Sequence, residues 1–558
     1  MKTIYKLIAF IVIITFGACD EFLEELPQGS LSEEQLVNSE EGVEALVIAA
    51  YSTLNGQIDN ASNAFNSPAT NWSFGDVVAD DAYKGGGGVG DQNNIHLMEI
   101  FSTNAGIIDL ERKWLASYEG VSRTNAAIRA IRDFEGWEQS QKDLRVAEMR
   151  LLRGHFYFDL KKIYNLIPFI DESLITSEEI RSVSNRELTS DELWAKIEED
   201  FIFARNTLPD VQEQVGRATR GSANAYLAKT YIFQEKWEAA IDAADLVINS
   251  PAGYGLLTNF PNVFEPEFNN SEESVFAVQY SINDGARNNG YNGSIGDRLI
   301  NPGGPFFAIR GFLRPTQNLI NAYKTDANGL PLFDTFNNAD LTDTDLVDPR
   351  LDHTVGRPGI PYLELPEVYD ASWARDPDVY GPYSPKKRVV PFTKPEFTLT
   401  IWPFSHAMNY MVIRFADVLL WKAEALIETE GLEEARAIIN QVRRRARDGE
   451  MVMELDGSGP AANYFMDEYT TMWTDVDLAR TALRFERRLE FAHEGHRFFD
   501  LVRWDVAEEV MNAYIAVEKS KRTYLSEAQF QSGKHEYFPI PRNQIDLSGG
   551  LLEQNPGY

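Results

Sequence analysis

The segment SANAYLAKTYIFQEKWEAAIDAADLVINS, residues 222–250, predicts two short helices joined by a tight turn. Apolar and small residues recur in it at helical spacing, first as Ala223, Leu227, Ala228 and Tyr231, then as Trp237, Ala240, Ala244 and Val247. Glu235-Lys236 separates the two groups, and Pro251 closes the unit because proline does not continue a helix. Small residues where two helices touch are typical of a tetratricopeptide-type hairpin, whose repeat is about 34 residues.

The same pattern recurs 195 positions later in the chain. Ala423, Leu426, Leu432, Ala435 and Val442 stand where Ala228, Tyr231, Trp237, Ala240 and Val247 stand in the first copy, with Gly431 at the turn. Similar helical content fills residues 114–134 and 144–165. Because one hairpin cannot bury its own apolar face, we expect a small stack of hairpins. Periodicity alone also allows an unrelated helical bundle.

Two long segments between the helical blocks, residues 60–108 and 251–411, are rich in Asn, Gly, Pro, Asp and aromatic residues. Loops of that length inside a compact protein are usually functional or disordered. Their many aromatic residues argue against disorder: Trp72, Phe74, Tyr83, Tyr291, Phe306, Phe307, Trp373, Tyr380, Tyr383 and Trp402. We therefore expect these loops to form a binding surface on a rigid helical frame.

The N-terminus predicts a lipoprotein signal peptide in residues 1–18. Lys2 and Lys6 precede a ten-residue apolar core, which is too short to span a bilayer as a stable helix. Cys19, the only cysteine, follows at the expected cleavage point and is the predicted lipidation site. The alternative is a plain secretory signal with a chance cysteine. Four carboxylates within six residues after Cys19 indicate export to the outer face of an outer membrane.

The composition excludes several classes of function. The formal net charge is -33, whereas nucleic-acid binding needs a basic stripe, so we expect no nucleic-acid partner and find neutral ligands easier to accommodate. A single cysteine rules out a disulfide framework and a cysteine metal site, and seven histidines give little further metal potential. We expect no cofactor and no bound metal as part of the function.

Three motifs resemble chemical sites without meeting their requirements. The glycine-rich run at residues 85–90 lacks the Lys-Ser or Lys-Thr of a phosphate loop and is better explained by a hinge or a close ligand approach. The histidines of residues 493–496 are three apart, not four as in a zinc-protease helix. Residues 326–329 begin like a calcium loop but lack later ligands, so we expect a turn.

Glu486 and Glu490 lie one helical turn apart and could suggest a carboxylate pair for acid-base chemistry. They alternate with Arg484, Arg487 and Arg488, so ion pairing on a helix face is the better interpretation.

Several segments together resemble the SusD/RagB family of outer-membrane nutrient-binding lipoproteins. They are Cys19–Leu23, Asp348–Leu351, Arg414–Leu420 with Ala423–Ala425, Glu486–Phe491 through Gly495–Trp504, and Phe538–Pro541 with Gln554–Tyr558. The resemblance implies a mostly α fold of about four tetratricopeptide-like helix pairs that cradle a large irregular, loop-rich region. It implies structural roles for Arg497, Asp500, Arg503 and Trp504, which should lock helices together. It also implies an extracellular lid on a SusC-like TonB-dependent transporter.

The predicted organisation follows from these features. Residues 1–18 form the signal peptide, residues 19–250 a SusD-like helical region with the first binding loops, and residues 251–558 a RagB/SusD C-terminal region. The irregular insertion 251–411 precedes the last helical hairpins.

Candidate ligand-binding residues follow from the chemistry of sugars. A sugar ring stacks its C–H face on an aromatic plane, and its hydroxyl groups need planar donors and acceptors. Residues of both kinds gather in the two irregular segments: Trp72, Asp76, Asp81 and Tyr83 in the first, and Arg287, Asn288, Tyr291 and Arg314 in the second, with Asp80, Asn289 and Arg310 beside them. Core packing or transporter contact is the alternative for any single aromatic residue.

The leading hypothesis is therefore a non-enzymatic lipoprotein that binds oligosaccharides or polysaccharides for a SusC-like transporter and is anchored to the outer membrane by lipid. A lid that binds peptide or another nutrient is the second hypothesis, and arginines among acidic loops leave it open. A surface glycosidase is the third, and it needs two carboxylates facing each other about 5 to 10 Å apart.

Overall fold

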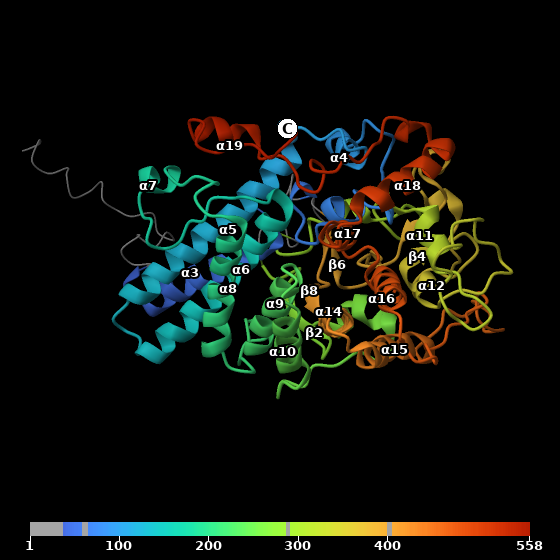
Figure 1. Ribbon diagram of the computed structural model, residues 1–558, viewed down its shortest axis with the longest axis horizontal. Helices are drawn as coiled ribbons and strands as arrows, with labels where there is room; N and C mark the ends of the chain where they lie inside the picture. Colours follow the sequence, from blue (N-terminus) through green and yellow to red (C-terminus); the bar gives the residue numbers. More distant parts are fainter. Residues whose placement is uncertain (1–36, 58–64, 286–290, 399–403) are drawn as a thin grey trace, which may run out of the picture.

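A stack of long helices forms one half of the protein in the computed structural model, which describes residues 37–57, 65–285, 291–398 and 404–558 (Figure 1). These helices are α3 (Glu40–Ser52), α5 (Ile108–Asp133), α6 (Gln139–Tyr164), α8 (Ser190–Thr207), α9 (Arg220–Ile232), α10 (Trp237–Ile248), α14 (Phe415–Glu428), α15 (Leu432–Asp448) and α16 (Val476–Phe491). In Figure 1 the stack runs from blue and cyan helices through green α9 and α10 to orange α14–α16.

Within the described ranges the helices pair as tetratricopeptide repeats do. Helix α3 packs on α5, α6 on α8, α9 on α10, and α14 on α15, which makes four pairs. The second helix of each pair also contacts the first helix of the next, and successive first helices contact each other, with α16 following the last pair. Each pair therefore covers the apolar face that its neighbour cannot bury alone. The prediction of a mostly α fold of about four hairpins is confirmed.

The two predicted hairpins match element for element. Helices α14 and α15 begin 195 residues after α9 and α10. Thr219 caps α9, because its side chain accepts a hydrogen bond from the backbone of Ser222. Ala228 and Ala240 are fully buried between the two helices, so small residues set their close approach as the pattern predicts.

The irregular half contains short elements only. Its strands are β1 (Ala82–Gly85), β2 (Ser274–Val278), β3 (Phe312–Pro315), β4 (Val355–Gly356), β5 (Ser384–Pro385), β6 (Phe397–Thr398), β7 (Ser405–His406) and β8 (Tyr410–Arg414). They form two-stranded antiparallel sheets β1–β3, β2–β8, β4–β5 and β6–β7. Because β1 pairs with β3, with Tyr83 opposite Arg314, the first irregular segment is fastened to the second.

The remaining helices complete the description. They are α4 (Asn93–Glu99), α7 (Ser177–Arg181), α11 (Gln317–Ala322), α12 (Arg350–Thr354), α13 (Pro377–Tyr380), α17 (Arg497–Arg503), α18 (Ala507–Lys521) and α19 (Arg542–Leu547), with single helical turns at Thr53–Asn55, Trp72–Asp76, Phe260–Phe264, Pro266–Phe268, Arg298–Ile300, Ala371–Trp373 and Thr523–Leu525. The turn expected at residues 326–329 is confirmed, since Gly329 N donates to Asp326 O at 3.0 Å.

The irregular half has an apolar core of its own. Trp72, Val77, Phe312, Tyr362 and Trp373 belong to one buried cluster that is separate from the core of the helical stack, and we call it the second apolar cluster. The rings of Trp72 and Phe312 meet edge to face with centroids 6.2 Å apart. Long loops of this kind keep one conformation because their aromatic side chains are buried.

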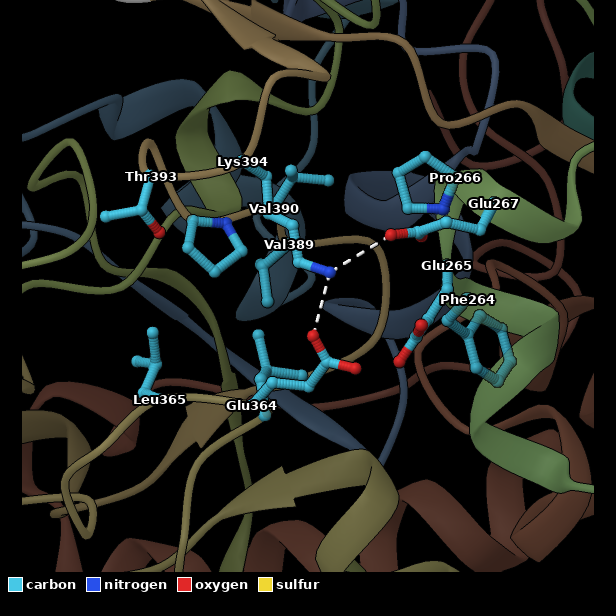
Figure 2. Close-up of a pocket in the computed structure, with 12 residues that line it drawn as sticks. Phe264, Glu265, Pro266, Glu267, Glu364, Leu365, Val389, Val390, Thr393 and Lys394 are labelled. Atoms are coloured by element: carbon cyan, nitrogen blue, oxygen red, sulfur yellow. Dashed lines mark hydrogen bonds and ion pairs between the residues drawn. The ribbon is translucent and has the colours of Figure 1, made fainter.

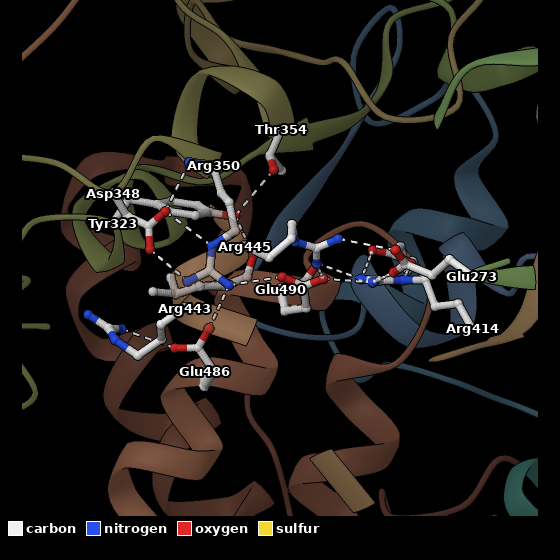
Figure 3. Close-up of polar contacts among 12 residues, drawn as sticks. Glu273, Tyr323, Asp348, Arg350, Thr354, Arg414, Arg443, Arg445, Glu486 and Glu490 are labelled. Atoms are coloured by element: carbon white, nitrogen blue, oxygen red, sulfur yellow. Dashed lines mark hydrogen bonds and ion pairs between the residues drawn. The ribbon is translucent and has the colours of Figure 1, made fainter. Parts of the chain in front are cut away.

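A buried network of ion pairs joins the two halves (Figure 3). Glu490 on α16 accepts hydrogen bonds from Arg350 at 2.9 Å, from Arg414 at 2.6 Å and from Arg445. Burial by itself raises the pKa of Glu490, but the guanidinium groups of Arg445, Arg414 and Arg350 hold that pKa well below its usual range. The network pairs Glu273, Asp348, Glu486, Glu490 and Glu494 with Arg350, Lys387, Arg414, Arg443 and Arg445.

The ion pairing expected for Glu486 and Glu490 is confirmed, but the expected partners are wrong. Both carboxylates bind arginines from other segments, while the arginines on α16 itself serve other contacts. Arg487 pairs with Asp500 at 2.9 Å, and Arg488 pairs with Asp81 at 2.8 Å. Helix α16 has several faces in contact with the protein, so its alternating charges point in different directions.

Structural roles are confirmed for the residues of the motif on α17. Arg497 pairs with Asp80 at 2.8 Å, which lies just before β1. Arg503 and the indole of Trp504 both donate to Glu424 on α14. These contacts lock α17 to the helical stack on one side and to the irregular half on the other.

Within the described ranges, none of the helices has the length and apolar character needed to cross a membrane. In the same ranges no group of three or more His, Cys, Asp or Glu side chains is placed to hold a metal ion.

Replacing Glu490 with Gln should lower the free energy of unfolding by about 3 to 5 kcal/mol, because three buried guanidinium groups lose their shared counter-charge. Urea unfolding followed by circular dichroism measures the change. Glu468 is the control, since its pairs with Arg444 and Arg447 lie at the surface, where each should contribute only about 0 to 1 kcal/mol when Glu468→Gln removes them. Equal losses in the two variants would contradict the central role of Glu490.

Replacing Trp72 with Ala should cost about 3 to 5 kcal/mol of stability, because it leaves a cavity in the second apolar cluster. The same urea titration measures it, with Leu478→Ala as a control because Leu478 is 43% exposed. A Trp72→Ala protein as stable as the parent would show that this ring is dispensable to the core.

Candidate functional site

The predicted binding residues of the first irregular segment are buried, so their assignment as ligand contacts is wrong. Trp72, Asp76, Asp81 and Tyr83 are all fully covered in the structure. The physical reason is that this segment is clamped between the second apolar cluster and the C-terminal helices, and its polar groups are used there.

Asp76 and Tyr83 of that segment both have partners inside the protein. The carboxylate of Asp76 accepts from the backbone N–H of Gly495 at 2.9 Å, and burial raises its pKa well above the ordinary value. Tyr83 donates its hydroxyl to Glu518 at 2.6 Å. The same carboxylates and phenol that could bind a sugar therefore stabilise the fold.

Arg314 in the second segment is also a structural residue, and its assignment to the ligand is wrong. Its guanidinium is fully buried and donates to the backbone oxygen of Gly381 at 2.6 Å. Burial lowers the pKa of Arg314 to about 10. Strand pairing places Arg314 opposite Tyr83, which turns both side chains into the interior.

Four predicted residues have a different outcome. Arg287 and Asn288 lie outside the described residues, as does Cys19. Tyr291 is half-buried, packs on Ile295, and accepts a hydrogen bond through its backbone oxygen from Gln57 at 3.3 Å.

A different surface brings aromatic rings and arginines together, and we call it the arginine–aromatic face. Its half-buried members are Phe306, Arg310, Arg375 and Phe404, whereas Arg298 and Phe65, which pack together nearby, are buried. A sharp turn at residues 301–305 creates it. Gly304 has φ +93°, and a Cβ there would lie 2.6 Å from the Trp373 ring, so only glycine fits this close approach.

The turn positions Arg310 against the neighbouring segments. The backbone oxygen of Arg310 accepts from the guanidinium of Arg375 at 3.2 Å. That guanidinium also pairs with Asp91 at 2.9 Å, and Asp91 in turn accepts from the backbone of Gly87. The glycine-rich run therefore makes a close approach to Arg375 of the same chain, whose Nη2 lies 2.5 Å from the place of a Cβ at Gly87.

Aromatic rings support two of these arginines. The guanidinium of Arg298 lies 4.8 Å from the ring centre of Phe65, and that of Arg310 lies 5.5 Å from the ring centre of Phe404. Burial and the charge of Arg310 lower the pKa of Arg298 to about 10. Phe306 and Phe404 are both half-buried, so part of each ring remains accessible to solvent.

The sequence indicates part of this group. Phe306 is among the loop aromatics and Arg310 is beside the candidate ligand contacts, whereas the sequence gives no sign of Arg298, Arg375 or Phe404. Arg310 and Arg375 are 65 positions apart, and no spacing rule relates them. The usable signal was the Pro-Gly-Gly-Pro turn at residues 302–305, which marks a place where the backbone approaches another group closely.

A groove lined by carboxylates lies next to this face. Its main cavity has a volume of about 570 Å³, and a smaller pocket of about 80 Å³ adjoins it (Figure 2). The two share Phe264, Glu265, Leu363, Glu364 and Leu365. We call it the acidic groove, after its carboxylates Glu265, Glu267, Glu364, Glu450 and Glu454.

Lys394 lines the smaller pocket of the acidic groove. Its ammonium group is held by Glu364 at 2.8 Å and by Glu267 at 3.1 Å, as Figure 2 shows. Burial and the nearby charges of Glu364 and Glu267 raise the pKa of Glu265. The groove is therefore a concave site with an excess of negative charge.

One strip of chain connects the two surfaces. Residues 389–391 and 393–394 line the groove, and the backbone N–H of Phe392 between them donates to Phe306 O at 3.0 Å. Chemically, the arginine–aromatic face offers ring surfaces and planar donors, the two features that sugar recognition uses. The acidic groove offers acceptors, which suit hydroxyl groups or cations.

Comparison with protein families identifies the fold family. Residues 272–558 match the model described as "SusD family", and residues 21–232 match one described as "Starch-binding associating with outer membrane". The chain is 24% identical to SusD-like protein P25 of Formosa agariphila, with 100% of both chains covered. It is also 24% identical to a SusD-like protein of Bacteroides ovatus, over 90% of this chain and 83% of that one.

Solved structures share the same fold. A "Laminarin binding SusD-like protein" superposes with a TM-score of 0.69 at 24% identity, covering 93% of this chain and 100% of the other. Surface glycan-binding protein A from Bacteroides thetaiotaomicron, in complex with laminarihexaose, gives 0.68 at 22% identity over 92% and 99% of the two chains. The resemblance seen in the sequence motifs is confirmed, and this chain belongs to the SusD family.

Proposed function

We propose that this protein binds polysaccharides or oligosaccharides at the cell surface and passes them, uncleaved, to a SusC-like TonB-dependent transporter. The observation that carries the proposal is the arginine–aromatic face, where the half-buried ring of Phe404 lies 5.5 Å from the guanidinium of Arg310 and the guanidinium of Arg375 donates to the backbone oxygen of Arg310. Rings stack on sugar C–H faces, and guanidinium groups donate to sugar oxygens. Family members of known structure are named for binding laminarin or laminarihexaose.

A lipid anchor at the N-terminus is the second part of the proposal. We propose that Cys19 carries the lipid and that the protein sits on the outer membrane facing outwards. Two or more fatty chains give stable anchoring, where one chain gives marginal binding. The match of residues 21–232 to an outer-membrane-associated family supports this location. A weak site is sufficient for such a lid, because the transporter below adds contacts at high effective concentration.

Peptide binding is the second candidate function, and the acidic groove favours it. Its carboxylates lie around a cavity of about 570 Å³, large enough for a short positively charged segment. Protection of the protein from heat by tetralysine, lost on Glu364→Gln, would favour this function over glycan binding.

Replacing Phe404 with Ala should weaken glycan binding about 2- to 10-fold, because one stacking surface is lost. Retardation of the full-length lipoprotein in gels that contain laminarin or laminarin sulfate measures it. Phe404→Tyr keeps the ring and should bind like the parent, and the melting temperature of each variant reports folding.

A variant in the acidic groove tests where on the protein the glycan binds. Glu364→Gln changes the acidic groove without touching Phe404, so it should leave retardation unchanged. If Glu364→Gln abolishes retardation while Phe404→Ala does not, the glycan binds in the groove and the assignment to the arginine–aromatic face is wrong. Shortening of the polysaccharide during incubation would contradict binding without cleavage.

Replacing Cys19 with Ala should release the protein from the outer membrane, since the lipid has no other attachment point in a chain with one cysteine. Fractionation of a Gram-negative host, with protease added to intact cells, measures membrane retention and surface exposure. Retention of the Cys19→Ala protein in the outer membrane, or protection of the parent from protease, would contradict the proposed anchoring.

A further inference from the structure

A small cavity lies where the helical stack meets the irregular half. Its volume is about 20 Å³, which is room for one water-sized occupant. Side chains of α6 and α9 line it together with residues of β8, of the segment around Asn71 and of the loop before α17. None of its described lining residues belongs to the acidic groove, so this is a separate place in the fold.

The cavity has more positive than negative charge. Its lining residues include one carboxylate, Asp159, and two ammonium groups, those of Lys162 and Lys229. The carboxylate already holds Lys162 at 2.7 Å and Lys113 at 2.5 Å. It also accepts from the side-chain amide of Asn71 at 2.9 Å. Two lysines therefore share this carboxylate, and Lys229 adds a third positive charge, in a protein whose net charge is -33.

Lys229 is a buried cation without a partner of its own. It is 7% exposed, and it makes no ion pair and no hydrogen bond with any described residue. Two aromatic rings lie 5.1 and 5.8 Å from its ammonium group, and neither carries a full negative charge. Burial and the charge of Lys162 lower the pKa of Lys229 to about 7, while Asp417 and Asp159 act in the opposite direction from beyond ion-pair distance.

Two further lining groups, the imidazole of His496 and the hydroxyl of Tyr410, have unused hydrogen-bonding atoms. Neither forms a hydrogen bond with another residue in the part of the chain that the structure describes. A phenol and a neutral imidazole each have one hydrogen to donate. Burial lowers the pKa of His496 well below its ordinary value, and the charges that lower it further belong to lysines and arginines. The field in the cavity is therefore positive.

Such a cavity suits a small anion. An ammonium group taken out of water needs a counter-charge in good geometry, and Lys229 has none at contact distance. Hydrogen-bond donors without acceptors need an acceptor as well. A volume of about 20 Å³ favours an ion of one atom over a polyatomic anion such as sulfate.

We propose that this cavity binds chloride. The ion neutralises Lys229 and accepts hydrogen bonds from Tyr410 on β8 and from His496 in the loop before α17. It thereby ties the helical stack to the irregular half. This site is independent of the proposed glycan binding, so either proposal can fail without the other.

Bromide in place of chloride tests the location, because bromide scatters X-rays anomalously. Crystals of the full-length lipoprotein grown in bromide should show an anomalous peak in the cavity, in contact with the ammonium group of Lys229. Crystals of Lys229→Met should lack that peak. A cavity that holds only water in the parent crystals overturns the proposal, and so does a bromide peak that persists in Lys229→Met.

Melting temperatures at constant ionic strength, with gluconate replaced stepwise by chloride, test the affinity. The parent should melt about 2 °C higher once chloride exceeds its Kd by about 100-fold. Lys229→Met should lose this dependence. Tyr410→Phe should raise the chloride concentration at half of the gain about 10-fold, because a hydrogen bond to a charged ligand is lost.

Lys161→Met is the matched control for Lys229→Met. Lys161 is also a buried lysine, and its ammonium group lies 5.0 Å from the ring centre of Trp194, but it donates to Ser190 and does not line the cavity. The Lys161→Met protein should keep the parent's dependence on chloride, whatever its own melting temperature. An equal dependence in the parent and in Lys229→Met would show a general effect of salt and overturn the proposal, as would an unchanged response in Tyr410→Phe.

Discussion

Glu490, a carboxylate buried among three guanidinium groups, fixes how the helical stack meets the irregular half of this protein. Removing charges from water costs several kcal/mol per ion, and the cost is recovered only when each charge meets its partner in good geometry. Arg350, Arg414 and Arg445 come from three separate segments. They reach the same carboxylate together in this arrangement of the two halves, so the network selects one packing among the many that an apolar interface would tolerate.

The same logic explains why the first irregular segment lies inside the protein. Arg488 and Arg497, from α16 and α17, pair with Asp81 and Asp80, which draws the segment against the C-terminal helices. Trp72 then packs into the second apolar cluster. Side chains with the chemistry of a sugar site become structural, and the arginine–aromatic face is the surface that we propose for the ligand instead.

Residue type is a poor guide to the site for this reason. A sequence shows that Tyr83 is aromatic and that Arg314 is cationic, but the strand pairing that buries both depends on residues more than 200 positions apart. Arg375 and Phe404 gave no signal, because each becomes relevant only through contact with Arg310. Whether a loop residue is buried depends on its contacts with such distant segments. Hydrophobic periodicity does not predict those contacts in segments without regular helices.

The sequence by itself determined the helices and the hairpin repeat, because helical periodicity and small residues at a helix contact act over a few positions along the chain. Its motifs also carried the resemblance to the family, and that resemblance implied that the charges around α17 lock helices together. Only the tertiary structure decided which loops face solvent and which arginines gather, since those outcomes depend on the pairing of charges between remote segments. Local sequence therefore specifies the helical frame, whereas the face that we propose for binding depends on which side chains the folded frame leaves exposed.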